Sequence, residues 1–307
     1  MIKRTLFIGN PAYISSANKL LVIKQPDPVL FKQEDDIKTI PIEDIGVLVL
    51  EHKQITITNY ALEQLVANNT AVITCDSRSM PNGLLLPLYG NTIQSERFSD
   101  QINASLPLKK QLWQQTITAK INNQASVLRY ATNEEHKNMT IWAGKVRSGD
   151  PENLEGRASA YYWKNLFSEI DSFVRGQFED APNNMLNYGY AVLRAIISRA
   201  LVSTGLLPTL GIHHHNRYNA FCLSDDIMEP YRPYVDKMVF DICHSSDNWK
   251  PELSKDIKKR LLQIPVEDVI INGKRSPLLV AATTTTASLY KCFSGESRKI
   301  LYPEMNG

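Results

Sequence analysis

The first ninety residues alternate short apolar runs with turn-forming residues, which is the pattern of a β-rich domain. Residues 4–8, 19–24, 38–42 and 46–50 are rich in β-branched or aromatic side chains. Residues 55–58 alternate apolar and polar positions with period two, as a half-buried strand does. The pattern therefore predicts several short strands over residues 1–90.

Helical spacing appears once within this part, over residues 59–67, where Leu62, Leu65 and Val66 share one face. A strand pattern returns at 71–75, and Met80-Pro-Asn-Gly predicts a turn. We found no residue set typical of catalysis here. Residues 1–90 are interpreted as a domain for dimerisation or docking.

In the second part of the chain the spacing of apolar residues becomes that of an α-helix. Residues 91–104 are polar and poorly periodic and are interpreted as a linker. From Leu106 onward Leu108, Leu112, Ile117 and Ile121 form an apolar stripe typical of a long helix. A further helix is predicted to start at 150–151, and others are predicted around 191–204, 234–242, 255–263 and 283–293. The fold class is thus mixed α and β in more than one domain, with residues 105–307 helical.

Charge and cysteine content narrow the function classes. Residues 103–307 carry 25 Lys and Arg against 21 Asp and Glu, whereas residues 1–102 carry 9 against 11. The helical part is therefore the better candidate for a polyanionic partner. The four scattered cysteines argue against a thiolate zinc site and a disulfide framework, and they favour the cytoplasm. No apolar run approaches the roughly 18–20 residues that span a bilayer, and no signal peptide is apparent.

Residues 210–233 concentrate groups that bind metal ions. They include the triplet His213, His214 and His215, and two acids three residues apart, Asp226 and Glu229. One imidazole with two or three carboxylates suits Mg²⁺ or Mn²⁺, which prefer oxygen ligands, and such a site performs phosphoryl transfer.

The triplet leaves the choice of histidine open. In an extended loop His214 would point away from His213 and His215. The outer two could then bind zinc in a hydrolase of a small molecule. A non-catalytic DNA-binding scaffold with a structural acidic cluster is a further alternative.

Glu155 is a separate candidate because its helical neighbours lack a cation. Asp150 and Pro151 are typical of a helix start, as N-cap and first helical residue. Glu155 then falls in the second turn, on a stripe that includes Tyr162. A carboxylate there faces desolvation without a local partner. Arg194 or Arg199, on an apolar helix, could pair with an acid of the site.

The order of these motifs resembles the CRISPR-associated adaptation integrases. The family pattern appears as Leu-Glu-Gly at 154–156, Leu-Gly-Ile-His-His at 210–214, and Asp-Asp-Ile-Met-Glu-Pro-Tyr-Arg at 225–232. Residues 54–58, 80–88 and 120–124 resemble the branch that accompanies single-protein RNA-guided effector nucleases, as in type II systems. The resemblance spans nearly the whole chain.

The resemblance implies a β-sandwich-like N-terminal domain followed by an all-α catalytic domain. It implies a homodimer that binds a small partner subunit (Cas two), double-stranded DNA with single-stranded ends, and, by extension, the effector nuclease of the system. The activity would be metal-dependent DNA cleavage and insertion of short foreign fragments (spacers) into a CRISPR array.

The resemblance also implies a set of site residues. Glu155, His214 and Glu229 would be metal ligands, with Asp226 as the alternative third ligand. Basic residues of the helical part would contact DNA phosphates. We name Arg232, Lys120 and Arg217 as candidates for this role.

Overall fold

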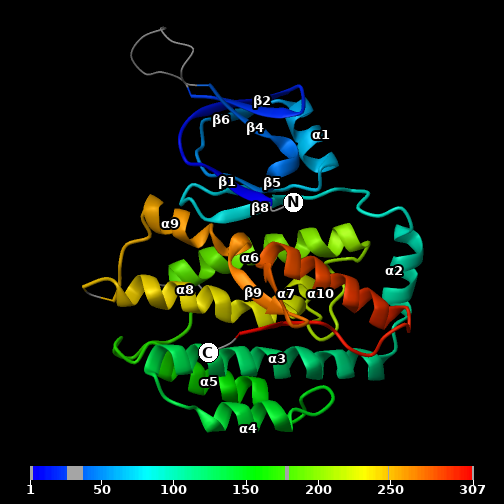
Figure 1. Cartoon of the computed structure of the whole chain (residues 1–307), viewed down its shortest axis with the longest axis vertical. Coiled ribbons are helices and arrows are strands. Elements are labelled where there is room, and N and C mark those ends of the chain that lie inside the picture. The colour runs from blue at the N-terminus through cyan, green and yellow to red at the C-terminus, as the bar shows by residue number, and fades with distance from the viewer. Residues whose placement is uncertain (1–2, 26–36, 177–179, 248, 306–307) are drawn as a thin grey trace. The chain divides into compact units, whose positions relative to one another are not determined.

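The computed structural model describes residues 3–25, 37–176, 180–247 and 249–305 and divides the chain into two compact units, Met1–Gly90 and Asn91–Gly307 (Figure 1). The sequence-based predictions for 1–90 and 105–307 also include the remaining residues, which lie outside the described part. No helix within the described ranges is long and apolar enough to cross a bilayer.

The first unit contains two four-stranded sheets. One has the order β1-β5-β7-β8, in which β1, β5 and β7 are parallel and β8 is antiparallel to β7. The other has the order β4-β3-β2-β6. The strands are β1 (Arg4–Ile8), β2 (Ala12–Ala17), β3 (Leu20–Lys24), β4 (Ile37–Pro41), β5 (Ile45–Leu50), β6 (Ile55–Ile57), β7 (Ala71–Cys75) and β8 (Pro81–Leu85).

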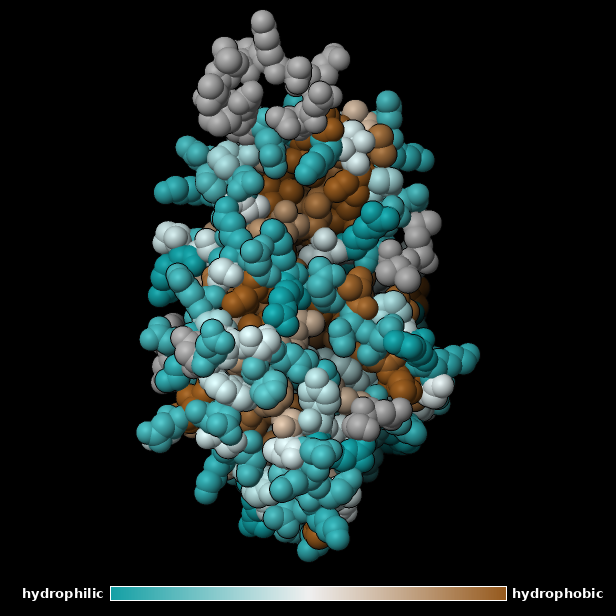
Figure 2. Space-filling view, turned by 60° about the vertical axis from the view of Figure 1, so that its left-hand side comes forward, coloured by the Kyte–Doolittle hydropathy of each residue, from teal (hydrophilic) through white to brown (hydrophobic). Residues whose placement is uncertain are grey.

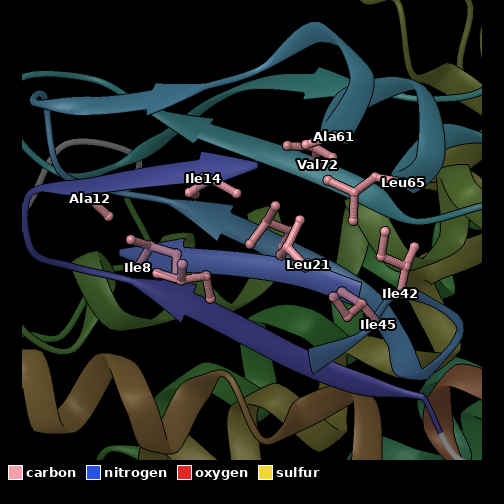
Figure 3. Packing of buried hydrophobic residues seen from close by; sticks show 11 residues of the cluster. Ile8, Ala12, Ile14, Leu21, Ile42, Ile45, Ala61, Leu65 and Val72 are labelled. Atoms are coloured by element: carbon pink, nitrogen blue, oxygen red, sulfur yellow. The ribbon is translucent and has the colours of Figure 1, made fainter. Parts of the chain in front are cut away.

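Both sheets and helix α1 (Asn59–Ala67) contribute to one apolar cluster (Figure 3). Ile14 and Leu21 come from one sheet, Leu48 from the other, and Leu65 from α1; each is at most 2% exposed. The continuous apolar run of β5 is explained by its place between two parallel neighbours, because such strands are buried on both faces. The predicted helix over 59–67 is confirmed, whereas the turn predicted at 80–83 overlaps strand β8.

Figure 2 shows where hydrophobic residues are exposed on one face of the molecule. They gather in one patch over the first unit and are dispersed among polar residues over the second. Tyr13 and Tyr60 are among the exposed large hydrophobic side chains of the first unit.

The second unit is mainly helical. Its helices are α2 (Gln94–Asn103), α3 (Leu106–Thr132), α4 (Lys137–Lys145), α5 (Leu154–Leu166), α6 (Asn183–Thr204), α7 (Cys222–Met228), α8 (Arg232–His244), α9 (Lys255–Leu261) and α10 (Leu278–Phe293). The second unit also contains the short 3₁₀ helices η3 (Glu229–Tyr231) and η4 (Ile264–Val266). A further 3₁₀ helix, η2 (Ile42–Asp44), lies in the first unit.

Two sequence-based predictions for this unit are wrong. The predicted linker at 91–104 contains α2, because Gln101 and Arg97 are not free polar residues. The Gln101 side-chain amide donates to the carbonyls of Leu207 and Leu210, and Arg97 donates to that of Thr204. The unit is also not all-α. It contains an antiparallel sheet of order β10-β9-β11, formed by β9 (Asp268–Ile271), β10 (Lys274–Pro277) and β11 (Pro303–Glu304).

A glycine sets the distance between α6 and α8. An ideal Cβ built on Gly189 of α6 would stand 2.5 Å from Cγ1 of Val235 on α8. The two backbones therefore approach more closely than any side chain at 189 allows. Gly144, near the end of α4, has no atom within 4 Å of such a Cβ.

We expect Gly189→Ala to lower the free energy of unfolding by about 1–3 kcal/mol, because the added methyl overpacks the α6–α8 contact. Gly144→Ala is the matched control. It should leave stability unchanged or raise it by up to about 1 kcal/mol, since alanine has the better helix propensity. Urea denaturation of both variants measures the difference. Equal effects of the two substitutions would contradict the packing argument.

Candidate active site

Glu155 is placed by the first turn of α5. The N-cap is Asn153, in the left-handed region at φ 50°, and its side-chain oxygen accepts from the amide of Gly156 at 3.1 Å. The Asp150 carboxylate accepts from the amides of Leu154 and Glu155, both at 2.9 Å. The sequence-based expectation that Asp150 is the N-cap is therefore wrong by three residues. Glu155 lies in the first turn, where the helix dipole favours a carboxylate.

Lys120 of α3 lies between two acids. Its Nζ donates to Oε1 of Glu155 at 2.7 Å and forms an ion pair with Oε2 of Glu229 at 2.6 Å. The lysine side chain is only 9% exposed, because its ammonium is held by the two carboxylates; its contact to a DNA phosphate stays a prediction. Burial alone would lower the pKa of Lys120, but Glu229 and Glu155 raise it above its usual value. Lys120 therefore carries its charge into the cluster.

Glu229 has a second cation, Arg232, whose Nη2 lies 3.1 Å from Oε1. Burial would raise the pKa of Glu229, but Arg232 and Lys120 bring it below its usual value. The guanidinium also lies 4.8 Å from the centre of the Tyr190 ring. Pro230 interrupts the helix: α7 ends at Met228 and the 3₁₀ helix η3 carries Glu229.

Asp226 does not share the environment of Glu229. One oxygen accepts from the amides of Ile212 and His213 at 2.7 and 2.9 Å. The other accepts from the amide of His214 at 3.3 Å and lies 2.5 Å from Nδ1 of its ring. Asp226 is fully buried, and both of its oxygens are used to hold this loop. The helical spacing of the two acids is real, but their roles differ.

Glycine is required where this loop passes Asp226. A Cβ on Gly211 would stand 2.4 Å from the backbone oxygen of His214 and 2.7 Å from Oδ2 of Asp226. Only a residue without a side chain lets the loop fold this tightly around the carboxylate.

The three histidines have separate surroundings. His213 stacks on Trp113 of α3 with ring centres 4.1 Å apart, whereas His214 faces Asp226. The hydrogen bond to Asp226 raises the pKa of His214, with smaller contributions from Glu229 and Glu155. Because Asp226 accepts at Nδ1, Nε2 is the ring nitrogen left for a ligand.

The α3 residues of the site follow helical spacing. Trp113 and Lys120 are seven residues apart, and Asn123 follows three later, so they share one face. The Asn123 side chain donates to the carbonyl of Pro230 at 2.7 Å and thereby fixes the segment that carries Glu229. Sequence reasoning missed this face. The sequence pattern that could have indicated it is the presence of polar residues on the apolar face of an amphipathic helix.

A second buried cluster joins the helices that carry the site. Asp236 of α8 accepts from Tyr190 of α6 at 2.5 Å and from Tyr162 of α5 at 3.0 Å. Asp236 lies four residues after Arg232, and Tyr162 seven after Glu155, so each is on the same helix face as its site residue. This spacing could have identified the cluster. We infer that it positions α5 and α8 relative to each other.

Two further arginines were candidates for the site. Arg194, one of the two arginines suggested for α6, pairs with Asp225 at 2.7 Å. Arg217 lies on the exposed loop, with its guanidinium 4.6 Å from the ring of Tyr218, itself 81% exposed.

The donor set suits a hard divalent ion. Within the described ranges, no three His, Cys, Asp or Glu side chains are arranged to hold a metal ion as they stand. Lys120 supplies the positive charge between the two glutamates. Oε2 of Glu229 is nevertheless buried without a hydrogen bond of normal geometry among the described residues. Two carboxylates and an imidazole nitrogen are ligands that Mg²⁺ and Mn²⁺ accept.

Comparison with known proteins decides the family. Residues 8–263 match the family described as CRISPR associated protein Cas1. The chain belongs to the Cas1 family. It is 35% identical over 98% of its length to a CRISPR-associated endonuclease Cas1 of Neisseria meningitidis serogroup C, covering 95% of that protein. It is 26% identical to a Cas1 of Francisella tularensis subsp. novicida, covering 81% of this chain and 85% of that one. The resemblance found in the sequence is confirmed.

Solved structures share the Cas1 fold. A casposase bound to integration product superposes with a TM-score of 0.77 at 21% identity, covering 98% of this chain and 92% of that one. A Cas1 protein from Thermotoga maritima gives 0.74 at 15% identity, covering 95% and 97%. The prediction of a chain that combines strands and helices is thus confirmed at the level of the fold.

The buried Asp236 predicts a pH dependence of stability. Burial raises the pKa of Asp236 to about 7, although the hydrogen bonds from Tyr190 and Tyr162 oppose this. The unfolded carboxyl titrates near 3.9, so the folded state binds an extra proton between these pH values. Stability contributed by Asp236 is present at low pH and is lost as the pH rises towards 7.

We expect wild type to lose roughly 2–3 kcal/mol relative to Asp236→Asn between pH 5 and pH 8. Urea denaturation at the two pH values measures this. Parallel curves for the two proteins would show that Asp236 does not titrate in this range.

Proposed function

We propose that this Cas1 protein is a divalent-metal-dependent DNA endonuclease and integrase that inserts short foreign DNA fragments into a CRISPR array by transesterification. The convergence of Glu155, Glu229 and His214 from three separate segments carries the proposal. The relative at 35% identity is named an endonuclease, and the casposase structure contains an integration product.

In this proposal Glu155, Glu229 and Nε2 of His214 hold Mg²⁺ or Mn²⁺. The bound ion would polarise a phosphodiester and stabilise the charge of the pentacoordinate phosphorus. Asp226 is the positioning residue: it orients the His214 ring and fixes its tautomer, as carboxylate partners of metal-bound histidines do. We therefore propose Glu229, rather than Asp226, as the third ligand.

The DNA contacts are proposed from position and charge. Arg232 holds Glu229 and sits at the rim of the cluster with its side chain 27% exposed, so a phosphate can approach it. Arg217 and the exposed ring of Tyr218 lie on the loop that follows His214. An arginine beside an exposed aromatic ring suits a phosphate and an unpaired base, respectively.

The partners follow from the family. Solved neighbours include a Cas6-RT-Cas1–Cas2 complex and a Cas1–DNA complex. We propose double-stranded DNA with single-stranded ends, a second copy of this chain, the small Cas two subunit and the effector nuclease as partners, in the cytoplasm. We assign docking to the β-rich first unit, which bears the apolar patch of Figure 2.

The ligands are tested by substitution. Glu155→Gln and His214→Ala should each abolish Mn²⁺-dependent joining of a labelled fragment to a supercoiled target, because each removes a ligand of the ion. His215→Ala is the matched control from the same triplet and should retain activity. Dimer formation, followed by light scattering, should persist in all variants.

Strand transfer by the purified Glu155→Gln protein would contradict the proposal that Glu155 is a ligand of the catalytic ion. DNA binding that survives in chelator without any nicked or joined product from wild type would favour a scaffold role. Tightly co-purified zinc would favour a hydrolase of another kind.

The roles of the two neighbouring acids are separable. Glu229→Gln should eliminate Mn²⁺ binding, whereas Asp226→Asn should weaken it by about 10- to 100-fold, as loss of a histidine's carboxylate partner does. Isothermal titration with Mn²⁺ measures both affinities. A larger loss for Asp226→Asn than for Glu229→Gln would reverse the assignment.

A further inference from the structure

The position between the proposed metal ligands is held by a side chain of the protein itself. Nζ of Lys120 approaches Glu155 and Glu229 to 2.7 and 2.6 Å, and these residues come from α3, α5 and η3. Two carboxylates cannot remain ionised side by side in a buried site without a cation. Lys120 supplies that cation.

The charges around Glu229 already balance. The two glutamates face two cations, Lys120 and Arg232. A divalent ion added to this set would leave a net positive charge of about two in a poorly solvated site, which is costly. Binding of the ion therefore requires one of the cations to leave.

Lys120 is the cation that can leave. Arg232 has a second attachment, because its guanidinium lies over the ring of Tyr190 at 4.8 Å. Lysine is a point charge on a flexible four-carbon stem, and it lacks the planar fork that fixes an arginine. Glu155 is also the more accessible acid, at 24% exposure against 5% for Glu229, which gives the ammonium a route to solvent.

We propose that Lys120 is a resident counter-ion that competes with the divalent cation for the Glu155–Glu229 pair. It is a positioning residue: it keeps the two acids together before the metal arrives and is displaced when the metal binds. This inference rests on the proposed function. Competition from Lys120 lowers the metal affinity of the free protein. When the ion binds, the displaced Lys120 ammonium becomes a free positive charge beside the site.

The test measures Mn²⁺ binding to the full chain without DNA, by isothermal titration. Lys120→Met should bind Mn²⁺ at least about tenfold more tightly than wild type, because the competitor is gone and a charged hydrogen bond no longer has to be broken. Lys120→Arg retains the charge and should not tighten binding. Lys110→Met, an exposed lysine on the same helix, is the control and should match wild type.

Stability gives a second readout that does not depend on activity. In chelator Lys120→Met should melt below wild type, because the acid pair has lost its cation. In saturating Mn²⁺ the difference should close. A difference of the same size with and without Mn²⁺ would mean that Lys120 is a fixed structural ion pair, and would overturn the inference.

Wild-type protein alone provides a third arm. Lys120 should resist acetylation by an N-hydroxysuccinimide ester in chelator and become several-fold more reactive with Mn²⁺, as quantified by mass spectrometry. Lys110 should react equally in both conditions. This arm decides the question even if Lys120→Met fails to fold.

The outcomes separate this inference from the proposed function. If Glu155→Gln abolishes Mn²⁺ binding while Lys120→Met binds with wild-type affinity and Lys120 labelling ignores Mn²⁺, the inference fails and the metal site stands. If Glu155→Gln and Glu229→Gln leave Mn²⁺ binding unchanged, both in the wild-type protein and in Lys120→Met, the proposed metal site itself is wrong.

Discussion

The second unit depends on one electrostatic constraint: Glu155 and the buried Glu229 converge on a single ammonium group, and two carboxylates this close need a cation between them. Lys120 and Arg232 satisfy it from α3 and α8, while Glu155 comes from α5. The helices are therefore held by charge at the site and by the Tyr162–Asp236–Tyr190 cluster about one to two helical turns away. A buried ion pair adds little net stability. The pairing of Lys120 with Glu229 is therefore better explained by the need to hold the two glutamate carboxylates close together.

The loop before α7 obeys a related rule. Asp226 is fully buried; it accepts from three backbone amides and lies against the His214 ring. These hydrogen bonds offset the cost of burying a polar group, and they fix the backbone around the carboxylate. The result is one histidine presented by the main chain, with its neighbour His213 stacked on Trp113.

The sequence predicted the elements that a single segment specifies. A β-branched apolar run predicted β5, helical patterns predicted α1 and α3, and motif order predicted Glu155, His214 and Glu229 as a set. Contacts between segments could not be predicted in this way. The polar run 91–104 looks like a linker until Leu207 and Leu210 offer carbonyls to Gln101. Likewise Lys120 reads as a surface lysine, because both of its partners are more than thirty residues away.

The start of α5 has a consequence for how such a chain can change length. Asp150 and Asn153 fix the first helical residue, and Glu155 is the second. Each residue of an α-helix turns the side chain by about 100°, so one residue inserted or deleted between the cap and Glu155 would swing the carboxylate away from Lys120. Between Asp150 and Glu155 related chains should therefore keep a constant length, whatever residues they exchange there.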